Sequence, residues 1–146
     1  MTRTPLPELL APAGDMSCFL ASMAAGADAA YLGLKNFSAR AGAENFSTTE
    51  LARMVDLANQ NGRRIYVAFN SLIKSGDLLS AGRLIKRLQR DAQPHGLIIQ
   101  DIGLIDVARQ AGFEGELHLS TLANISSARD LKTVQDAVKA LKAVDA

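Results

Sequence analysis

Polar side chains that could bind a ligand recur directly after short apolar segments of the chain. The longest polar segment follows the apolar run AAYLG (29–33) and carries Asn36, Arg40 and Asn45. Connections in compact domains usually take ~4–6 residues, and longer ones tend to be functional or disordered. An arginine beside Asn and Ser offers a fork of hydrogen-bond donors to an anion, although it equally fits a solvated surface. We therefore expect Arg40, Asn36 and Asn45 to bind substrate.

Five further candidates lie at or just beyond the ends of later apolar runs: Asn70, Asp101, His118, Ser120 and Asn124. We assign His118, Asp101 and Asn70 to catalysis, and Ser120 and Asn124 to substrate binding. Each has an ordinary structural alternative. An Asn or Asp after a strand can hydrogen-bond its own turn. His118 alternates with two leucines and so faces away from them, yet a lone strand histidine is more often a packed core residue than a ligand.

Several familiar reaction motifs are absent from the sequence. It contains no GxGxxG, Walker loop, HExxH, CxxC or GxSxG. His118 and Ser120 share a strand face, but no acid or oxyanion hole can be assigned to complete a triad. The single Cys18 excludes an intrachain disulfide and a metal site built from several cysteines of this chain. We expect Cys18 to be buried packing, and we assign no metal ligand and no cofactor to the chain itself.

Five apolar runs have the pattern of strands buried on both faces: 8–14, 29–33, 64–70, 96–101 and 116–121. The segments between them show helical periodicity. The third of these helices should start near Asp77 and bury Leu78, Ala81, Ile85, Leu88 and Ala92. Ser47 and Glu50 form an S-x-x-E capping box before one helix, and Asp15 fits the N-cap of another. Glycines 26, 62 and 112 fit helix ends that need a positive φ. Strand and helix alternate five times, which predicts an α/β fold with a parallel sheet.

Two α/β architectures fit this order. One is a partial (β/α) TIM-type barrel of about five units, and the other is an open doubly wound parallel sheet. A complete barrel needs ~250 residues, so the 146 residues form a single domain, 1–146, that cannot close one alone. In both architectures ligands bind at the carboxyl ends of the strands. The candidate residues collect at those ends. His95 lies in a turn at the opposite end, and we expect it to have no role.

The composition is that of a globular chain with a core, since 48% of residues are hydrophobic and 21% are charged. A formal charge of +1 gives no general attraction to nucleic acid or to an anionic membrane. No apolar run approaches the ~18–20 residues of a membrane span, and the N-terminus lacks the apolar core of a signal peptide. We expect a cytoplasmic protein without a membrane partner.

Seven short segments occur in a recognisable order and spacing: ELLAPAGD (8–15), GADAAYLG (26–33), FSAR (37–40), NF (45–46), YVAFN (66–70), QDIG (100–103) and LHLSTLAN (117–124). Together they resemble the N-terminal half of the barrel domain of the collagenase-like peptidase family, peptidase family U32. The resemblance implies a (β/α) barrel and so favours the partial barrel over the doubly wound sheet.

The resemblance also implies function. The family was named for collagen and peptide hydrolysis, and other members are linked to hydroxylation of ribosomal or transfer RNA and to oxygen-independent hydroxylation in ubiquinone synthesis. Members of those branches hold an iron–sulfur cluster through several cysteines in the later part of the chain. We expect an N-terminal fragment of an enzyme that acts in hydroxylation of an RNA base, with peptide hydrolysis and a non-catalytic half-barrel as alternatives. The iron–sulfur cluster is expected in the full-length parent alone, and the isolated chain is expected to be inactive.

The chain stops after the fifth unit, where family members continue. We therefore expect a truncated N-terminal part of a larger barrel enzyme, or a chain completed by a partner subunit. Exposed edges of a parallel sheet pair with other chains unless they are covered. We expect self-association, a second chain over the open edge, or repacking of the final helix (127–145) over the open side. RNA or peptide is the substrate expected through the parent.

Overall fold

A single sheet of five parallel strands forms the centre of the protein. In the computed structural model, residues 6–35, 37–38 and 46–144 are described, with side chains as far as Asp136. The strands are β1 (Leu10–Pro12), β2 (Ala29–Gly33), β3 (Arg64–Phe69), β4 (Gly96–Ile99) and β5 (Glu116–Leu119). They pair in the order β1-β2-β3-β4-β5. The five strands predicted from the sequence are confirmed.

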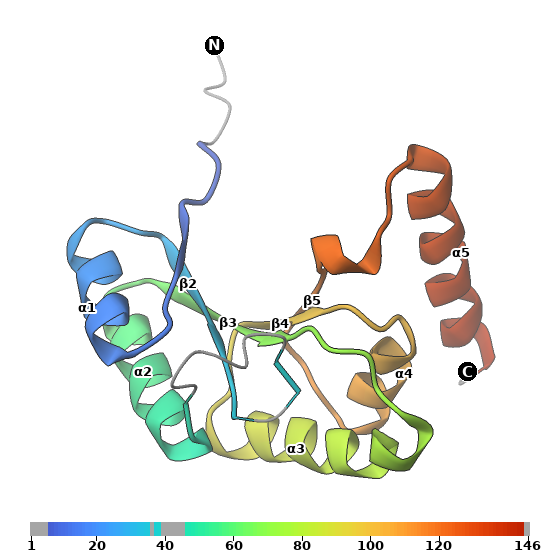
Figure 1. The fold of residues 1–146 in the computed structure, drawn as a ribbon, viewed down its shortest axis with the longest axis horizontal. Helices are drawn as coiled ribbons and strands as arrows, with labels where there is room; N and C mark the ends of the chain where they lie inside the picture. Colours follow the sequence, from blue (N-terminus) through green and yellow to red (C-terminus); the bar gives the residue numbers. More distant parts are fainter. Residues whose placement is uncertain (1–5, 36, 39–45, 145–146) are drawn as a thin grey trace.

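Helices follow the strands: α1 (Met16–Ala24), α2 (Thr48–Gln60), α3 (Leu78–Asp91), α4 (Gly103–Gln110) and α5 (Ala128–Val144), with short 3₁₀ turns η1 (Ser75–Asp77) and η2 (Thr121–Ala123). The first four helices cover one face of the sheet, and the other face is left open (Figure 1). A doubly wound sheet reverses its strand order at a switch point and carries helices on both faces. The sequential order therefore decides for the partial barrel.

The core lies between the sheet and these four helices. Alternate residues of β3, namely Ile65, Val67 and Phe69, are buried against the helix layer. The residues between them face the open side, and Tyr66 there is still only 2% exposed. Burial on both faces explains why the strand sequences are nearly continuous in apolar residues.

Local signals in the sequence set the helix ends. Ser47 Oγ accepts from the Glu50 amide at 3.3 Å, and the Glu50 carboxylate accepts from the Ser47 amide at 2.8 Å, so the predicted capping box is confirmed. The hydroxyl and the amide of Ser47 lower the pKa of Glu50. Asp15 caps α1 by accepting from the Cys18 amide at 2.7 Å. Glycines 26, 62 and 112 all have positive φ, as predicted.

Two predictions about packing are wrong. Cys18 is exposed, because α1 buries Phe19 and the preceding residue points to a different side of the helix. Leu78, expected in the core with the apolar face of α3, is 41% exposed because it lies at the first position of that helix, beyond the layer that covers the sheet.

The last helix forms where it was predicted but does not cover the open side of the sheet. After β5 the chain passes through η2 and a left-handed turn at Asn124 (φ 56°), and α5 stands away from the other helices (Figure 1). Leu131 on its apolar face is 45% exposed. The expected repacking of this helix is therefore wrong.

No helix within the described residues is both long and apolar enough to cross a bilayer.

The capping box gives a stability prediction. Replacing Ser47 with Ala should lower the free energy of unfolding by about 1 kcal/mol, because an amide of the first turn of α2 loses its acceptor. Urea denaturation measures the change. Thr49→Ala, at an exposed position two residues further along the chain, is the matched control and should change stability by less than ~0.5 kcal/mol. An equal loss in both variants would contradict the role of the box.

Candidate functional site

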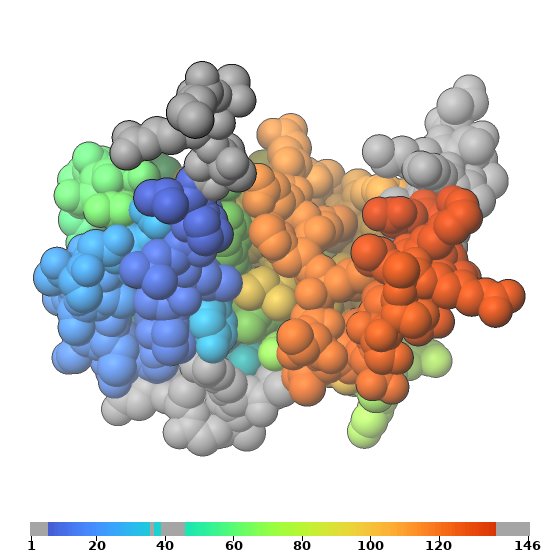
Figure 2. Space-filling view, turned by 90° about the horizontal axis from the view of Figure 1, so that it is seen from above, coloured from blue at the N-terminus to red at the C-terminus, as the bar shows by residue number. Residues whose placement is uncertain are grey.

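The open face of the sheet carries a cavity of about 410 Å³. Figure 2 looks onto this face and shows a hollow between the blue N-terminal segment and the orange segment of β5 and η2, with atoms of the central strands at its floor. Its lining comes from all five strands and from the segments after β3 and β5: Leu10, Tyr31, Tyr66, Ala68, Asn70, Ile98, His118, Leu119, Ser120, Thr121 and Leu122. The cavity thus combines aromatic rings with a few polar groups.

Strand register brings the aromatic residues together. Tyr31, Tyr66, Gly96 and Glu116 lie side by side across β2 to β5. A Cβ on Gly96 would lie 3.1 Å from Cδ1 of Tyr66 and 2.8 Å from the Glu116 carbonyl oxygen. The missing side chain at Gly96 leaves room for the Tyr66 ring to reach His118, and the two ring centroids are 4.7 Å apart at 47°.

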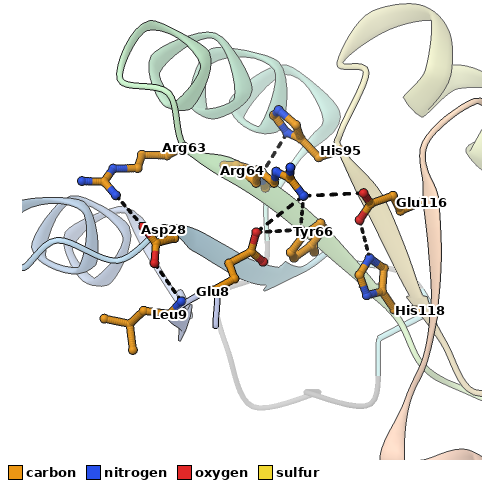
Figure 3. Close-up of polar contacts among 10 residues, drawn as sticks. Glu8, Leu9, Asp28, Arg63, Arg64, Tyr66, His95, Glu116 and His118 are labelled. Carbon is orange, nitrogen blue, oxygen red and sulfur yellow. Dashed lines mark hydrogen bonds and ion pairs between the residues drawn. The ribbon is translucent and has the colours of Figure 1, made fainter. Parts of the chain in front are cut away.

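A polar network lies at the amino end of the same face (Figure 3). Arg64 Nη1 lies 3.6 Å from a Glu8 oxygen and 3.5 Å from Glu116 Oε1. It also donates to the Tyr66 hydroxyl at 3.5 Å, and that hydroxyl donates to Glu8 Oε2 at 3.2 Å. One guanidinium therefore joins two carboxylates and a phenol, from β3, β5 and the segment before β1.

The network perturbs its own ionisation. Burial raises the pKa of Tyr66, and the hydrogen bond from Arg64 partly opposes that rise. The pKa of Arg64 is raised, first by its hydrogen bond to Tyr66 and then by the nearby carboxylates. Tyr66 is thus a neutral phenol and Arg64 a cation at physiological pH.

The His118 side chain hydrogen-bonds to this network. Its Nε2 lies 2.9 Å from Glu116 Oε2, so the ring is directed back along β5. The side chain is 41% exposed and lines the cavity. The alternative of an ordinary core histidine does not describe this environment.

The other predicted residues fall into three groups. Asn70 and Ser120 line the cavity beside His118, and Ser120 Oγ accepts from the Leu122 amide at 3.1 Å. The two oxygens of Asp101 accept from the Gly103 amide at 3.0 Å and the Ile73 amide at 3.2 Å, and its catalytic role stays a prediction. Asn124 is exposed and ends η2.

The substrate-binding residues expected in the long loop cannot be placed. Asn36, Arg40 and Asn45 lie outside the described residues, and their roles stay predictions.

Sequence reasoning missed Tyr31, Tyr66, Arg64, Glu116 and Glu8. A signal was present in β3, where alternation puts Arg64, Tyr66 and Asn70 on the face opposite the buried Ile65 and Val67. The involvement of Glu8 could not be found this way, because it lies before β1 and reaches Tyr66 across 58 positions of sequence.

His95 was expected to have no role and proves to be structural. Its Nδ1 accepts from the Ile65 amide at 3.1 Å, while its backbone pairs with Ile65 and Glu116. Burial first, and then the charge of Arg64, lower the pKa of His95. A neutral imidazole with its proton on Nε2 is therefore the form that joins β3 to the start of β4.

The described residues do not form a site for a metal cluster. No group of three His, Cys, Asp or Glu side chains that could hold a metal ion exists in the described part of the chain. An iron–sulfur cluster needs several thiolates, and Cys18 is the single cysteine.

Comparison with known proteins assigns the family. The model of peptidase family U32 matches residues 14–142. The chain belongs to peptidase family U32. The family predicted from seven short segments is therefore confirmed.

Relatives in this family carry different names. A tRNA hydroxylation protein of Bacillus subtilis is 34% identical over 85% of this chain and 29% of its own length. A collagenase of Porphyromonas gingivalis is 32% identical over 86% of this chain and 30% of its own. A 23S rRNA 5-hydroxycytidine synthase of Escherichia coli is 34% identical over 88% of this chain and 19% of its own. The U32 chain described here thus spans less than a third of these relatives.

A solved structure supports the fold. A U32 peptidase of known structure superposes with a TM-score of 0.73 at 11% identity, over 93% of this chain and 57% of that one. At this identity the likeness shows the fold alone.

The close approach at Gly96 gives a second prediction. Gly96→Ala should lower the free energy of unfolding by about 1–3 kcal/mol, since the added methyl group meets backbone and the Tyr66 ring. Gly82→Ala is the matched control. Its Cβ would meet Val107 at an ordinary 3.5 Å, and it lies inside helix α3, so it should raise stability by about 0.5–1 kcal/mol. Thermal denaturation compares the two, and a neutral Gly96→Ala would contradict the tight contact.

The lowered pKa of His95 predicts a pH dependence. An unfolded imidazole takes up a proton near its ordinary pKa of about 6.5, whereas folded His95 takes it up at lower pH. The unfolded state therefore binds more protons below about pH 6.5, and the free energy of unfolding falls as the pH falls. His95→Asn keeps an acceptor near the Nδ1 position but does not titrate. Urea unfolding at about pH 7.5 and about pH 5 should show a smaller loss in the variant, and equal losses would refute the role of His95.

Proposed function

We propose that this chain forms the N-terminal part of the barrel domain of a U32 enzyme that acts in hydroxylation of an RNA base. The observation that supports it best is the cavity on the open face. A pair of rings, Tyr66 and His118, forms one wall, and the polar groups of Asn70 and Ser120 lie beside them.

An unpaired nucleobase suits such a cavity. Proteins that recognise single-stranded RNA stack bases on aromatic side chains and hydrogen-bond their edges. Enzymes that act on a base take it into a pocket with the same two features. The volume of about 410 Å³ is in the range of small-ligand pockets. Tyr31 and His118 would contact the ring, and Asn70 and Ser120 would bond its edge.

The names of two relatives support RNA as the substrate. One is a tRNA hydroxylation protein, and another is a synthase of 5-hydroxycytidine in 23S rRNA. Arg40 in the long loop is proposed to contact an RNA phosphate, for which a guanidinium is well suited.

Peptide hydrolysis is a second candidate, favoured by the relative named collagenase. The geometry of the cavity gives it less support. Ser120 Oγ accepts from a backbone amide and His118 Nε2 bonds Glu116, and the described part of the chain shows no hydrogen bond between these two side chains. A serine nucleophile needs such a bond to its base.

The cofactor of the proposed reaction is not supplied by this chain. An iron–sulfur cluster in the full-length parent would require thiolates that residues 1–146 do not contain. The part played by the residues of this chain is to bind and orient the base.

Deleting the gene in its source organism tests the proposal. Mass spectrometry of nucleosides from transfer and ribosomal RNA should show loss of one nucleoside that carries an added oxygen atom. The wild-type gene should restore it. A gene with His118→Ala should restore at least tenfold less at equal protein abundance, because the base loses a stacking and hydrogen-bonding partner worth ~1–3 kcal/mol.

Arg90→Gln is the control, since Arg90 lies on α3 and pairs with Asp91. It should restore the nucleoside fully. An unchanged nucleoside profile together with lost collagen cleavage would favour the peptidase. No change in either would favour a non-catalytic half-barrel.

A further inference from the structure

Glu116 contacts two different partners with its two oxygens. Oε1 lies 3.5 Å from Arg64 Nη1, and Oε2 lies 2.9 Å from His118 Nε2. Arg64 is itself held between Glu8 and Glu116. The carboxylate therefore has a fixed orientation, with one oxygen turned to a guanidinium and the other to an imidazole (Figure 3).

A carboxylate can only accept a hydrogen bond, so the ring nitrogen that faces it must carry the proton. That nitrogen is Nε2 of His118. In the neutral ring, Nδ1 is then left with a lone pair and acts as an acceptor. The hydrogen bonds found among the described residues include none to Nδ1 of His118, and the side chain lines the cavity.

We propose that Glu116 is a positioning residue that holds His118 in the Nε2-protonated tautomer, so that Nδ1 accepts a hydrogen bond from an amino or N–H group of a base in the cavity. The Tyr66 ring packs against the His118 ring, with the two ring centroids 4.7 Å apart, and limits rotation of the imidazole. The position of the proton does not depend on the reaction. The recognition of an amino-bearing base rests on the proposed function and deepens it.

The charge of Arg64 makes the proposal testable by an isosteric change. The guanidinium of Arg64 has only donors. In Glu116→Gln the side-chain amide oxygen of the new glutamine should therefore turn to Arg64. The amide NH₂ then faces His118 Nε2, which must become the acceptor. The proton should move to Nδ1, and the group offered to the cavity changes from acceptor to donor.

The tautomer is measured on the 146-residue chain labelled with nitrogen-15 histidine, at alkaline pH. The chain has two histidines, and His95 is an internal reference because its Nδ1 accepts from a backbone amide. Wild type should show Nε2–H in both rings. Glu116→Gln should convert His118 to Nδ1–H and leave His95 unchanged, which also reports that the variant is folded.

Glu8→Gln is the matched control. Glu8 is the other carboxylate on Arg64, and no contact between it and His118 occurs in the described part of the chain. It removes the same charge from the same guanidinium, so the tautomer of His118 should stay as in wild type. A wild-type His118 with its proton on Nδ1, or the same tautomer in wild type and Glu116→Gln, overturns the positioning role.

Recognition is tested with cytidine and 2-pyrimidinone riboside, which lacks the 4-amino group of cytidine. Wild type should bind cytidine roughly 3- to 10-fold more tightly, as expected for one hydrogen bond. Glu116→Gln should remove this preference, and Glu8→Gln should retain it. Equal affinities in wild type, or no binding of either nucleoside, would overturn the recognition step.

The two proposals fail separately. The tautomer measurement involves no RNA, so a wrong tautomer leaves the proposed function standing. The expected tautomer together with an unchanged RNA nucleoside profile would overturn the proposed function and keep the positioning role.

Discussion

Burial of alternate strand residues beneath α1 to α4 is the constraint on which the rest of the structure depends. Hydrophobic burial contributes ~25 cal/mol per Å² of apolar surface, and Ile65, Val67 and Phe69 lie wholly under the helices. With those residues fixed, the side-chain period of a strand leaves Arg64, Tyr66 and Asn70 to the other face. The site on the open face is therefore a consequence of where the core lies.

The open face is divided between support and binding. At its amino end, Arg64 joins Glu8, Tyr66 and Glu116. At its carboxyl end, Asn70 and Ser120 line the cavity. Barrel enzymes generally keep stability at the first end and chemistry at the second. His118 joins the two here, since its ring lines the cavity while Nε2 is bound to the support.

The uncovered face also bears on what surrounds this chain. The sheet has two edges, β1 and β5, and α5 lies away from both the sheet and the other helices (Figure 1). The matched part of this chain covers less than a third of the length of its U32 relatives. Self-association and a second chain over the open sheet edge stay predictions.

The sequence by itself determined the elements and the family. Apolar runs gave five strands, Ser47 with Glu50 marked the start of α2, and three glycines marked helix ends, because these signals depend on near neighbours. Seven segments gave the family. The sequence also predicted Asn70 and Ser120 at the carboxyl ends of strands, where both line the cavity, since the end of an apolar run is a local property.

Tertiary structure decided the rest. The sequential strand order selected the partial barrel over the doubly wound sheet. In the folded chain both oxygens of Asp101 accept from backbone amides, and His118 Nε2 bonds Glu116. The Tyr66 ring reaches His118 because Gly96 of β4, which lies between them, has no side chain. Glu8 bonds Tyr66 from the segment before β1. Such contacts depend on register between strands distant in sequence, and no local pattern of residues encodes that register.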